Sequence, residues 1–273
     1  MRILKIINNN VISALDEWGT EIVAMGRGIG FQKKAGQEMA ETAAEKIFRL
    51  ESPTMEQFEE LIVNMPLACV QVSDEIISYG KTVLAQQLSQ SVYLTLTDHI
   101  HFAITRFHDG MLFENALYNE IRRFYPDEFD VGQHALELIE KRTGVRLPQD
   151  EAASIAFHLV NAEYGLKYGD IQRMSRLIRH LIGMVGERYP LAEDSLETDR
   201  LRTNLKFILN RLLLKEMPSG AEGDSFFSDF IRKHCVREYE LAEKMKDYIE
   251  AVCGCKMTDG EVIYLTIQLK YTL

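Results

Sequence analysis

Two histidines, His99 and His158, are the residues whose types and positions most clearly suggest chemistry. An imidazole titrates near neutral pH and carries a nucleophilic nitrogen. Each histidine has a matched position in a second copy of the same sequence pattern, where Asn204 and Gln268 stand instead. Amides keep the polarity of imidazoles but lack the nucleophile. A histidine pair that served only for hydrogen bonding could be replaced in this way, whereas a pair needed for chemistry could not.

The repeat that relates these positions covers most of the chain. The pattern Leu-x-x-His-x-x-Phe-x-x-x-Arg at 96–106 recurs at 201–211, with asparagine for histidine, after a shift of 105 residues. A glutamate seven residues before His158 likewise recurs seven residues before Gln268, after a shift of 110. Aligned pairs in the same order indicate two related units.

Apolar spacing predicts what these units are. From residue 56 onward apolar residues recur three and four positions apart, as in amphipathic helices. The sequence therefore predicts two all-α helical-bundle repeats, over 57–169 and 170–273. Ser73-Asp74 and 148–151 have the composition of helix starts.

The first part of the chain has a different period. Short β-branched runs with turn signals between them predict a small antiparallel sheet with strands at 2–7, 10–16, 21–25 and 30–34. Good helix formers then predict a linking helix at 38–50. We call residues 1–56 the head. Because fewer than about 60 residues make a thin core, we expect the head to dimerise.

Charge is distributed unevenly between the head and the rest of the chain. The net charge of −10 should repel nucleic acid and anionic lipid. Residues 1–37, however, carry five basic and three acidic side chains, against 26 basic and 38 acidic in the remainder. This asymmetry predicts that one end touches a polyanion while the other contacts proteins.

Composition narrows the class of protein and its setting. A chain with 46% hydrophobic and 26% charged residues is expected to fold. No apolar run approaches the roughly 18 residues of a membrane helix, and the first residues lack the layout of a secretory signal. Four cysteines are too few for a disulfide framework, so we expect a reduced, cytoplasmic setting.

Three patterns that could hold a ligand are weak. The glycines of 26–30 have G-x-G-x-G spacing without the helix and acidic residue of a dinucleotide-binding turn. His99 and His101 form an H-x-H pair, but on a helix residues i and i+2 point apart. The Cys-Gly-Cys segment at 253–255 has no second pair to complete a zinc site. We predict no metal, no cofactor and no enzymatic activity, since no nucleophile–base–orienter set is recognisable.

Three segments together resemble a known family. The head sequence KIINNNVISALDEWGTEIVAMGRGIGFQKKAG resembles the RNA-binding domain of the BglG/LicT transcriptional antiterminators. SVYLTLTDHIHFAI at 91–104 and LPQDEAASIAFHLVNAE at 147–163 resemble the family's paired regulation domains (PRDs) of the sugar phosphotransferase system (PTS). The resemblance covers essentially the whole chain, in the family's domain order.

The resemblance implies a homodimer that binds a hairpin in nascent mRNA. The bound hairpin excludes a terminator, so that sugar-uptake genes, of the β-glucoside type, are expressed. It also implies phosphorylation of His99 and His158 in the first PRD, with the sugar permease (enzyme II) as the inhibiting donor. The phosphocarrier HPr activates many members through second-PRD histidines. Asn204 and Gln268 stand at those positions here, so we predict that HPr does not stimulate this protein.

The resemblance also assigns RNA binding to seven residues of the head: Lys5, Asn8, Asn10, Gly26, Arg27, Gly28 and Phe31. Their types suit the role, because RNA sequence is read at unstacked bases by aromatic stacking and by amide or guanidinium hydrogen bonds. Lysine and arginine also contact phosphates.

Two alternatives stay open. The asparagines and glycines could be turn residues, with Phe31 in the core. The whole chain could also be a protein-interaction module, tethered to a PTS permease by its PRDs, with weak or lost RNA binding.

Overall fold

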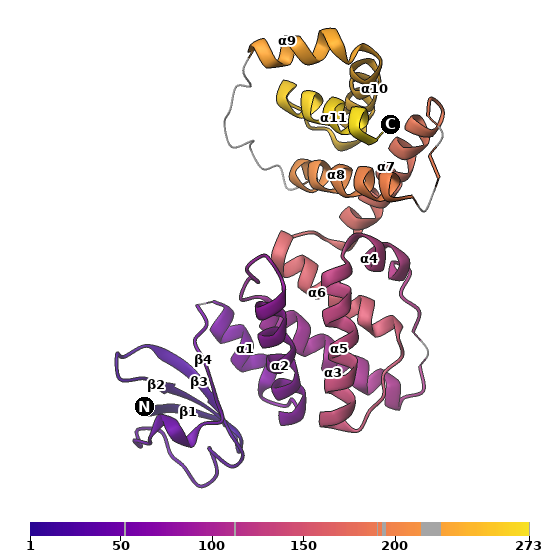
Figure 1. Ribbon diagram of the computed structural model, residues 1–273. Helices are drawn as coiled ribbons and strands as arrows, with labels where there is room; N and C mark the ends of the chain where they lie inside the picture. The colour runs from indigo at the N-terminus through magenta and orange to yellow at the C-terminus, as the bar shows by residue number, and fades with distance from the viewer. Residues whose placement is uncertain (52, 112, 190, 193–194, 214–224, 273) are drawn as a thin grey trace. The chain divides into compact units, whose positions relative to one another are not determined.

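The chain forms two compact units, Met1–Glu163 and Tyr164–Leu273. The structure, a computed structural model, describes residues 1–51, 53–111, 113–189, 191–192, 195–213 and 225–272. The first unit holds a β-sheet followed by a helical bundle, and the second holds helices (Figure 1). Within these residues no helix is both long enough and apolar enough to cross a membrane.

An antiparallel sheet with strand order β1-β2-β3-β4 forms the head. Its strands are β1 (Arg2–Asn8), β2 (Val11–Leu15), β3 (Glu21–Met25) and β4 (Lys46–Phe48). The first three strands confirm the prediction from β-branched runs and turn signals. Their register pairs Asn8 with Val11 and Val11 with Met25.

The fourth strand lies elsewhere than predicted. Residues 30–32 lie in turns and residues 33–34 have no regular structure. The Phe31 amide donates to the Gly28 carbonyl (3.0 Å). The Gly30 amide donates to the Asn9 carbonyl (3.0 Å), so this segment folds back onto the turn between β1 and β2. The predicted strand is wrong because the amides of Gly28 and Gly30 donate to Asn10 and Asn9, at the β1–β2 turn, and not to a neighbouring strand.

The predicted helix over 38–50 is also wrong. The segment contains a short 3₁₀ turn, η1 (Glu41–Ala43), and then β4. The Glu45 amide donates to the Met25 carbonyl (2.8 Å), and Phe48 is only 3% exposed. Pairing with the edge of β3 and burial of Phe48 outweigh the helix propensity of the segment.

Both faces of the sheet are covered. On one face, four buried side chains form a core cluster: Ile3, Ile12, Ala24 and Ile29. On the other face Phe48 packs on Phe58 of α1 (Thr54–Ile62), with ring centroids 5.0 Å apart. Both rings also contact Tyr93. The helical bundle thus covers the face that a small sheet cannot bury by itself.

The rest of the first unit is a bundle of α2 (Leu67–Val83), α3 (Val92–His108), α4 (Tyr118–Phe124), α5 (Pro126–Thr143) and α6 (Asp150–Tyr164). The predicted helix start at 148–151 is confirmed, because α6 begins there. The predicted start at Ser73-Asp74 is wrong. Ser73 is buried within α2, where its hydroxyl donates to the Cys69 carbonyl (2.7 Å).

The second unit repeats this order of helices, with α7 (Tyr168–Gly186), α8 (Leu196–Leu213), α9 (Ser225–His234), α10 (Val236–Cys253) and α11 (Asp259–Thr272). Helices α5 and α10 even end alike, each at a glycine in the left-handed conformation, Gly144 (φ 74°) and Gly254 (φ 69°). The predicted pair of all-α repeats is confirmed.

Gly132 allows α5 and α6 to approach closely, because a Cβ there would lie 2.2 Å from the Ala152 carbonyl oxygen. We predict that Gly132→Ala lowers the free energy of unfolding by about 1–3 kcal/mol, since helix backbone must shift. Gly183→Ala in α7 is the matched control, because no atom lies within 4 Å of the added methyl. It should stabilise by about 0.5–1 kcal/mol. Urea unfolding measures both, and equal effects would contradict the packing argument.

Candidate functional sites

The first candidate site lies where the β1–β2 turn meets the loop after β3. We call residues 8–10 and 26–31 the turn–loop surface. The Gly26 amide donates to the Asn10 carbonyl (3.0 Å), and the Gly28 amide donates to Asn10 Oδ1 (2.9 Å). Six of the seven residues predicted to bind RNA therefore lie together. Asn10 holds the loop through its side chain, so this residue has a structural role in the turn.

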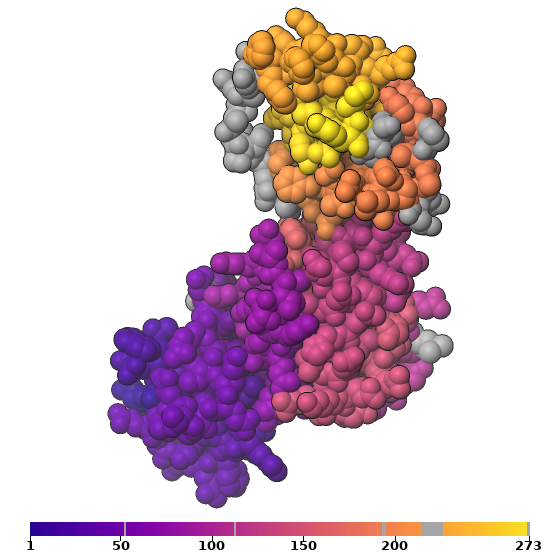
Figure 2. Space-filling model, viewed as in Figure 1, coloured from indigo at the N-terminus to yellow at the C-terminus, as the bar shows by residue number. Residues whose placement is uncertain are grey.

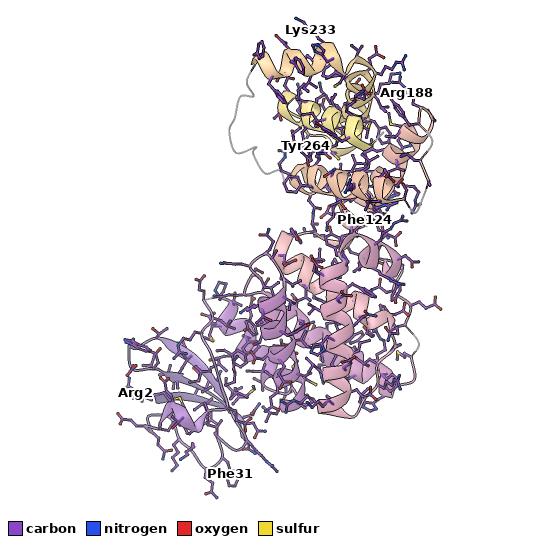
Figure 3. The ribbon with its side chains drawn as sticks, in the orientation of Figure 1. Arg2, Phe31, Phe124, Arg188, Lys233 and Tyr264 are labelled. Carbon is purple, nitrogen blue, oxygen red and sulfur yellow. The ribbon has the colours of Figure 1, made fainter. Side chains whose placement is uncertain are left out.

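The turn–loop surface presents an aromatic ring and a cation to solvent. Phe31 is 58% exposed and lies at the outer edge of the head (Figure 3), so the interpretation of Phe31 as a core residue is wrong. Arg27 and Gly28 are exposed too, whereas Gly26 is buried. Lys5 lies on β1 with 65% of its side chain exposed. An exposed ring beside cations can stack a base and contact phosphates.

Asn8 is differently placed. Its Oδ1 accepts a hydrogen bond from the Asn10 amide (2.8 Å). Its Nδ2 donates to the carbonyls of Ile62 and Val63, each at 3.2 Å, at the C-terminal end of α1. In this conformation the side chain of Asn8 caps α1 and presents no donor to a ligand.

The second candidate site brings the two histidines together. His99 on α3 and His158 on α6 have ring centroids 4.7 Å apart. His99 Nε2 lies 3.2 Å from Oε2 of Glu151, which is 1% exposed. Neither of these two atoms has an aligned hydrogen-bond partner within the described residues. Arg106 on α3 forms the other ion pair of Glu151.

Burial and neighbouring charge set the protonation of this site. Burial, together with the charge of His99, lowers the pKa of His158 to about 3. His158 is therefore neutral at pH 7 and keeps a lone pair for an electrophile. Burial alone would raise the pKa of Glu151, but His99 and Arg106 more than offset it and the pKa is lowered. Glu151 is thus an ionised, buried carboxylate held by the Arg106 guanidinium and the His99 ring.

The residues of the two sequence patterns considered for metal binding, His99 with His101 and Cys253 with Cys255, have other surroundings in the structure. His101 turns away from His99 and lies 4.0 Å from the Cys69 thiol on α2, measured from Nδ1 to Sγ. Burial raises the pKa of Cys253 to about 11, which keeps it a protonated thiol. No group of three histidine, cysteine, aspartate or glutamate side chains suited to a metal ion is found in the part of the chain that the structure describes.

The second unit has the same arrangement with amides. Asn204 Nδ2 donates to Gln268 Oε1 (2.5 Å), so the two matched positions meet as the two histidines do. Arg211 and Glu261 form an ion pair in the place of Arg106 and Glu151. Our sequence reasoning did not identify these ion pairs, although the arginine and the glutamate recur in both copies of the repeat.

Comparison with known proteins finds two kinds of domain in this chain. The family model for the CAT RNA-binding domain matches residues 1–57, and that for the PRD domain matches 74–162 and 171–272. Transcription antiterminator LicT of Bacillus subtilis is 41% identical over 99% of this chain and 98% of its own length. The chain belongs to the family of CAT–PRD transcription antiterminators.

Other family members support the assignment. The β-glucoside operon antiterminator of Dickeya chrysanthemi is 37% identical to this antiterminator, over 99% of this chain and 96% of its own. A crystal structure of GlcT CAT-PRDI has a TM-score of 0.52 and 30% identity, covering 59% of this chain and 97% of that one. A CAT domain implies RNA binding, and PRDs imply interaction with PTS proteins.

The lowered pKa of His158 predicts a pH dependence of stability. An unfolded histidine takes up a proton near pH 6.5, whereas folded His158 does so only near pH 3. Between these values the unfolded chain binds the extra proton, so stability falls as the pH falls. Between pH 7 and pH 5 this effect lowers the free energy of unfolding of the native chain by up to about 2 kcal/mol. We predict that the His158→Gln variant does not show this part of the loss.

Urea unfolding at both pH values measures this effect. His108→Gln, at an exposed position at the end of α3, is the matched control and should follow the native chain. Parallel pH curves for the native chain and His158→Gln would contradict the assignment of a buried neutral imidazole.

Proposed function

We propose that this antiterminator binds, as a homodimer, an imperfect hairpin in the leader of a β-glucoside operon. The bound hairpin excludes an overlapping terminator, so transcription continues into sugar-uptake and utilisation genes. The observation that carries the proposal is the turn–loop surface, whose exposed Phe31 and Arg27 lie on glycine-rich backbone. The names of the relatives, LicT and a β-glucoside operon antiterminator, support the choice of operon.

The seven predicted RNA-binding residues have different roles in this proposal. Phe31 stacks on an unpaired base, and Gly28, with φ of 70°, lets RNA approach the backbone. Arg27 and Lys5 contact phosphates or a base edge. Gly26 and Asn10 hold the loop in shape. Asn8 hydrogen-bonds to a base edge once its side-chain amide no longer donates to the carbonyls of Ile62 and Val63.

Phosphorylation of His99 and His158 by the PTS permease inhibits this activity in our proposal. A phosphoryl group brings nearly two negative charges. On His99 it would lie beside Glu151, a buried carboxylate, and the repulsion would be costly in a desolvated site. Arg106 is the cation placed to receive the phosphate, at the expense of its pair with Glu151. The first PRD would repack as a result.

The second PRD has no such acceptor at its matched site, because Asn204 and Gln268 are amides. We therefore propose that HPr does not activate this protein through that site. A histidine that accepts phosphate is a substrate and not a catalyst, so we propose a cytoplasmic regulator without cofactor, metal or enzymatic activity.

A second candidate function remains, a PRD interaction module tethered to a permease with weak or lost RNA binding. The observation in its favour is the engaged amide of Asn8, which is hydrogen-bonded to α1. RNA binding by the full chain distinguishes the two functions.

We predict that Phe31→Ala weakens binding of the leader hairpin about 5- to 100-fold, because stacking of a base on an aromatic ring contributes about 1–3 kcal/mol. Trp18→Ala is the matched control, since Trp18 is another exposed aromatic residue of the head (73%) and lies in the β2–β3 turn. It should leave the affinity unchanged. Titration of the full chain at fixed salt measures both, and equal losses would argue against a base-stacking role for Phe31.

We predict that a reconstituted PTS with its permease labels this protein on His99 or His158 and not within 170–273. Peptide mapping under conditions that preserve phosphohistidine locates the label. His180→Ala, a change of an exposed second-unit histidine, should not alter labelling, whereas His99→Ala with His158→Ala should abolish it. Label within 170–273 after incubation with phosphorylated HPr would refute the proposal for the second PRD.

A further inference from the structure

The turn–loop surface borders directly on the first PRD. Sheet pairing places Asn8, Val11, Met25 and Lys46 in one row across the four strands, at the end of the sheet that carries this surface. The helices of the first PRD approach the same row. In the space-filling view the indigo surface of the head runs without a break into the purple surface of the first helices (Figure 2).

The end of α1 contacts Asn8 by hydrogen bonds. The Asn8 amide has two N–H groups, and they are directed to the carbonyls of Ile62 and Val63. Ile62 is the last residue of α1 and Val63 is its C-cap. The Ile62 carbonyl also accepts from the Met65 amide (3.3 Å), so Asn8 is its second donor. A base that takes the donors of Asn8 must take them from α1, because each N–H serves one strong acceptor at a time.

Acidic side chains of the same helices face cations of the head. Glu59 of α1 lies 3.9 Å from the Lys5 ammonium group, and Asp74 of α2 lies 2.9 Å from that of Lys46. A carboxylate placed on a lysine occupies the position that an RNA phosphate would take. Glu59 thus pairs with a predicted RNA contact, Lys5, and Asp74 pairs with a second cation of the head, Lys46.

A third contact reaches the loop of the turn–loop surface. Gln71 of α2 donates from Nε2 to Oε2 of Glu45 (2.8 Å), and Oε1 of Glu45 accepts from the Arg27 amide (3.0 Å). The loop backbone at Arg27 is therefore linked to α2 through one carboxylate. Together the contacts extend from Lys5 to Arg27, along the border of the predicted RNA-binding residues.

We propose that α1 and α2 of the first PRD mask one border of the RNA-binding surface, so that RNA and the end of α1 compete for Asn8. Binding of the hairpin displaces the end of α1, and docking of the first PRD lowers the affinity for RNA. This inference rests on the proposed function. It adds an autoinhibitory contact within one chain, which is distinct from the choice of operon and from the phosphorylation site.

The histidine site is placed to act on this contact. α3 carries His99 and packs against both α1 and α2. A rearrangement around His99 therefore changes the surface against which α1 and α2 pack. It would thereby change how strongly these two helices compete with RNA for the head.

Hydrogen exchange of the full chain, with and without the leader hairpin RNA, tests the competition. We expect the amides of 58–65 to exchange at least about threefold faster in the complex, because their helix end loses its cap. Amides of α5 should not change. Unchanged or slower exchange at 58–65 in a saturated complex would overturn the proposal. Absence of RNA binding would instead overturn the proposed function, and this inference with it.

Two charge-matched substitutions in α2 provide a second test on the full chain. Asp74→Asn and Glu75→Gln each remove one negative charge, but Asp74 pairs with Lys46 of the head and Glu75 pairs with Arg142 of α5. We expect Asp74→Asn to bind the hairpin about two- to fivefold more tightly than Glu75→Gln, the range expected for loss of one surface ion pair. Equal affinities of the two variants would overturn the proposal as well.

Discussion

The packing of α1 on the sheet is the constraint on which the first unit depends. Four short strands bury one face around Ile12 and Ala24 and leave Phe48 on the other. Phe58 of α1 and Tyr93 of α3 cover that face with edge and tilted ring contacts. Because rings of α1 and α3 cover Phe48, the head packs on the helices that follow it, and both belong to one compact unit.

This packing also places a regulatory element beside the candidate RNA contacts. Once Phe58 fixes α1 on the sheet, the last turn of the helix reaches the β1–β2 turn and meets Asn8. The same side chain that resembles an RNA contact of the family then serves as a helix cap. Regulation of the head by the first PRD therefore requires no separate hinge or linker, since the cap and the RNA would use the same two N–H groups.

Comparison of the two repeats separates the features of a PRD that both copies need for folding from those that only the first copy has. An arginine–glutamate ion pair is present in both units, as Arg106 with Glu151 and as Arg211 with Glu261. The glutamate is buried in the first unit and partly buried in the second, with 1% and 15% of its side chain exposed, and such a carboxylate needs a cation beside it. The ring pair of the first unit is replaced by the hydrogen-bonded pair Asn204 and Gln268 in the second. The two amides satisfy each other by a hydrogen bond, whereas the two imidazoles meet only as rings and can accept a phosphoryl group.

The parts of the structure that depend on local pattern could be predicted from the sequence. Period-2 runs predicted β1 to β3, apolar spacing predicted the helical repeats, and the repeat itself predicted that His99 and His158 would have matched amide positions. The strand Lys46–Phe48 could not be predicted in this way, because edge pairing with β3 overrides a segment rich in helix formers. The role of Asn8 as a cap was equally hidden, since its partners lie 54 and 55 residues away.

The most direct test of this account is a crystal structure of the full chain bound to its leader hairpin. We expect Phe31 to stack on an unpaired base and Nδ2 of Asn8 to donate to RNA. The hydrogen bonds from Asn8 to the carbonyls of Ile62 and Val63 should then be broken. A complex in which the hairpin is bound specifically while Asn8 still caps α1 would contradict the central claim that RNA and the first PRD share one surface of the head.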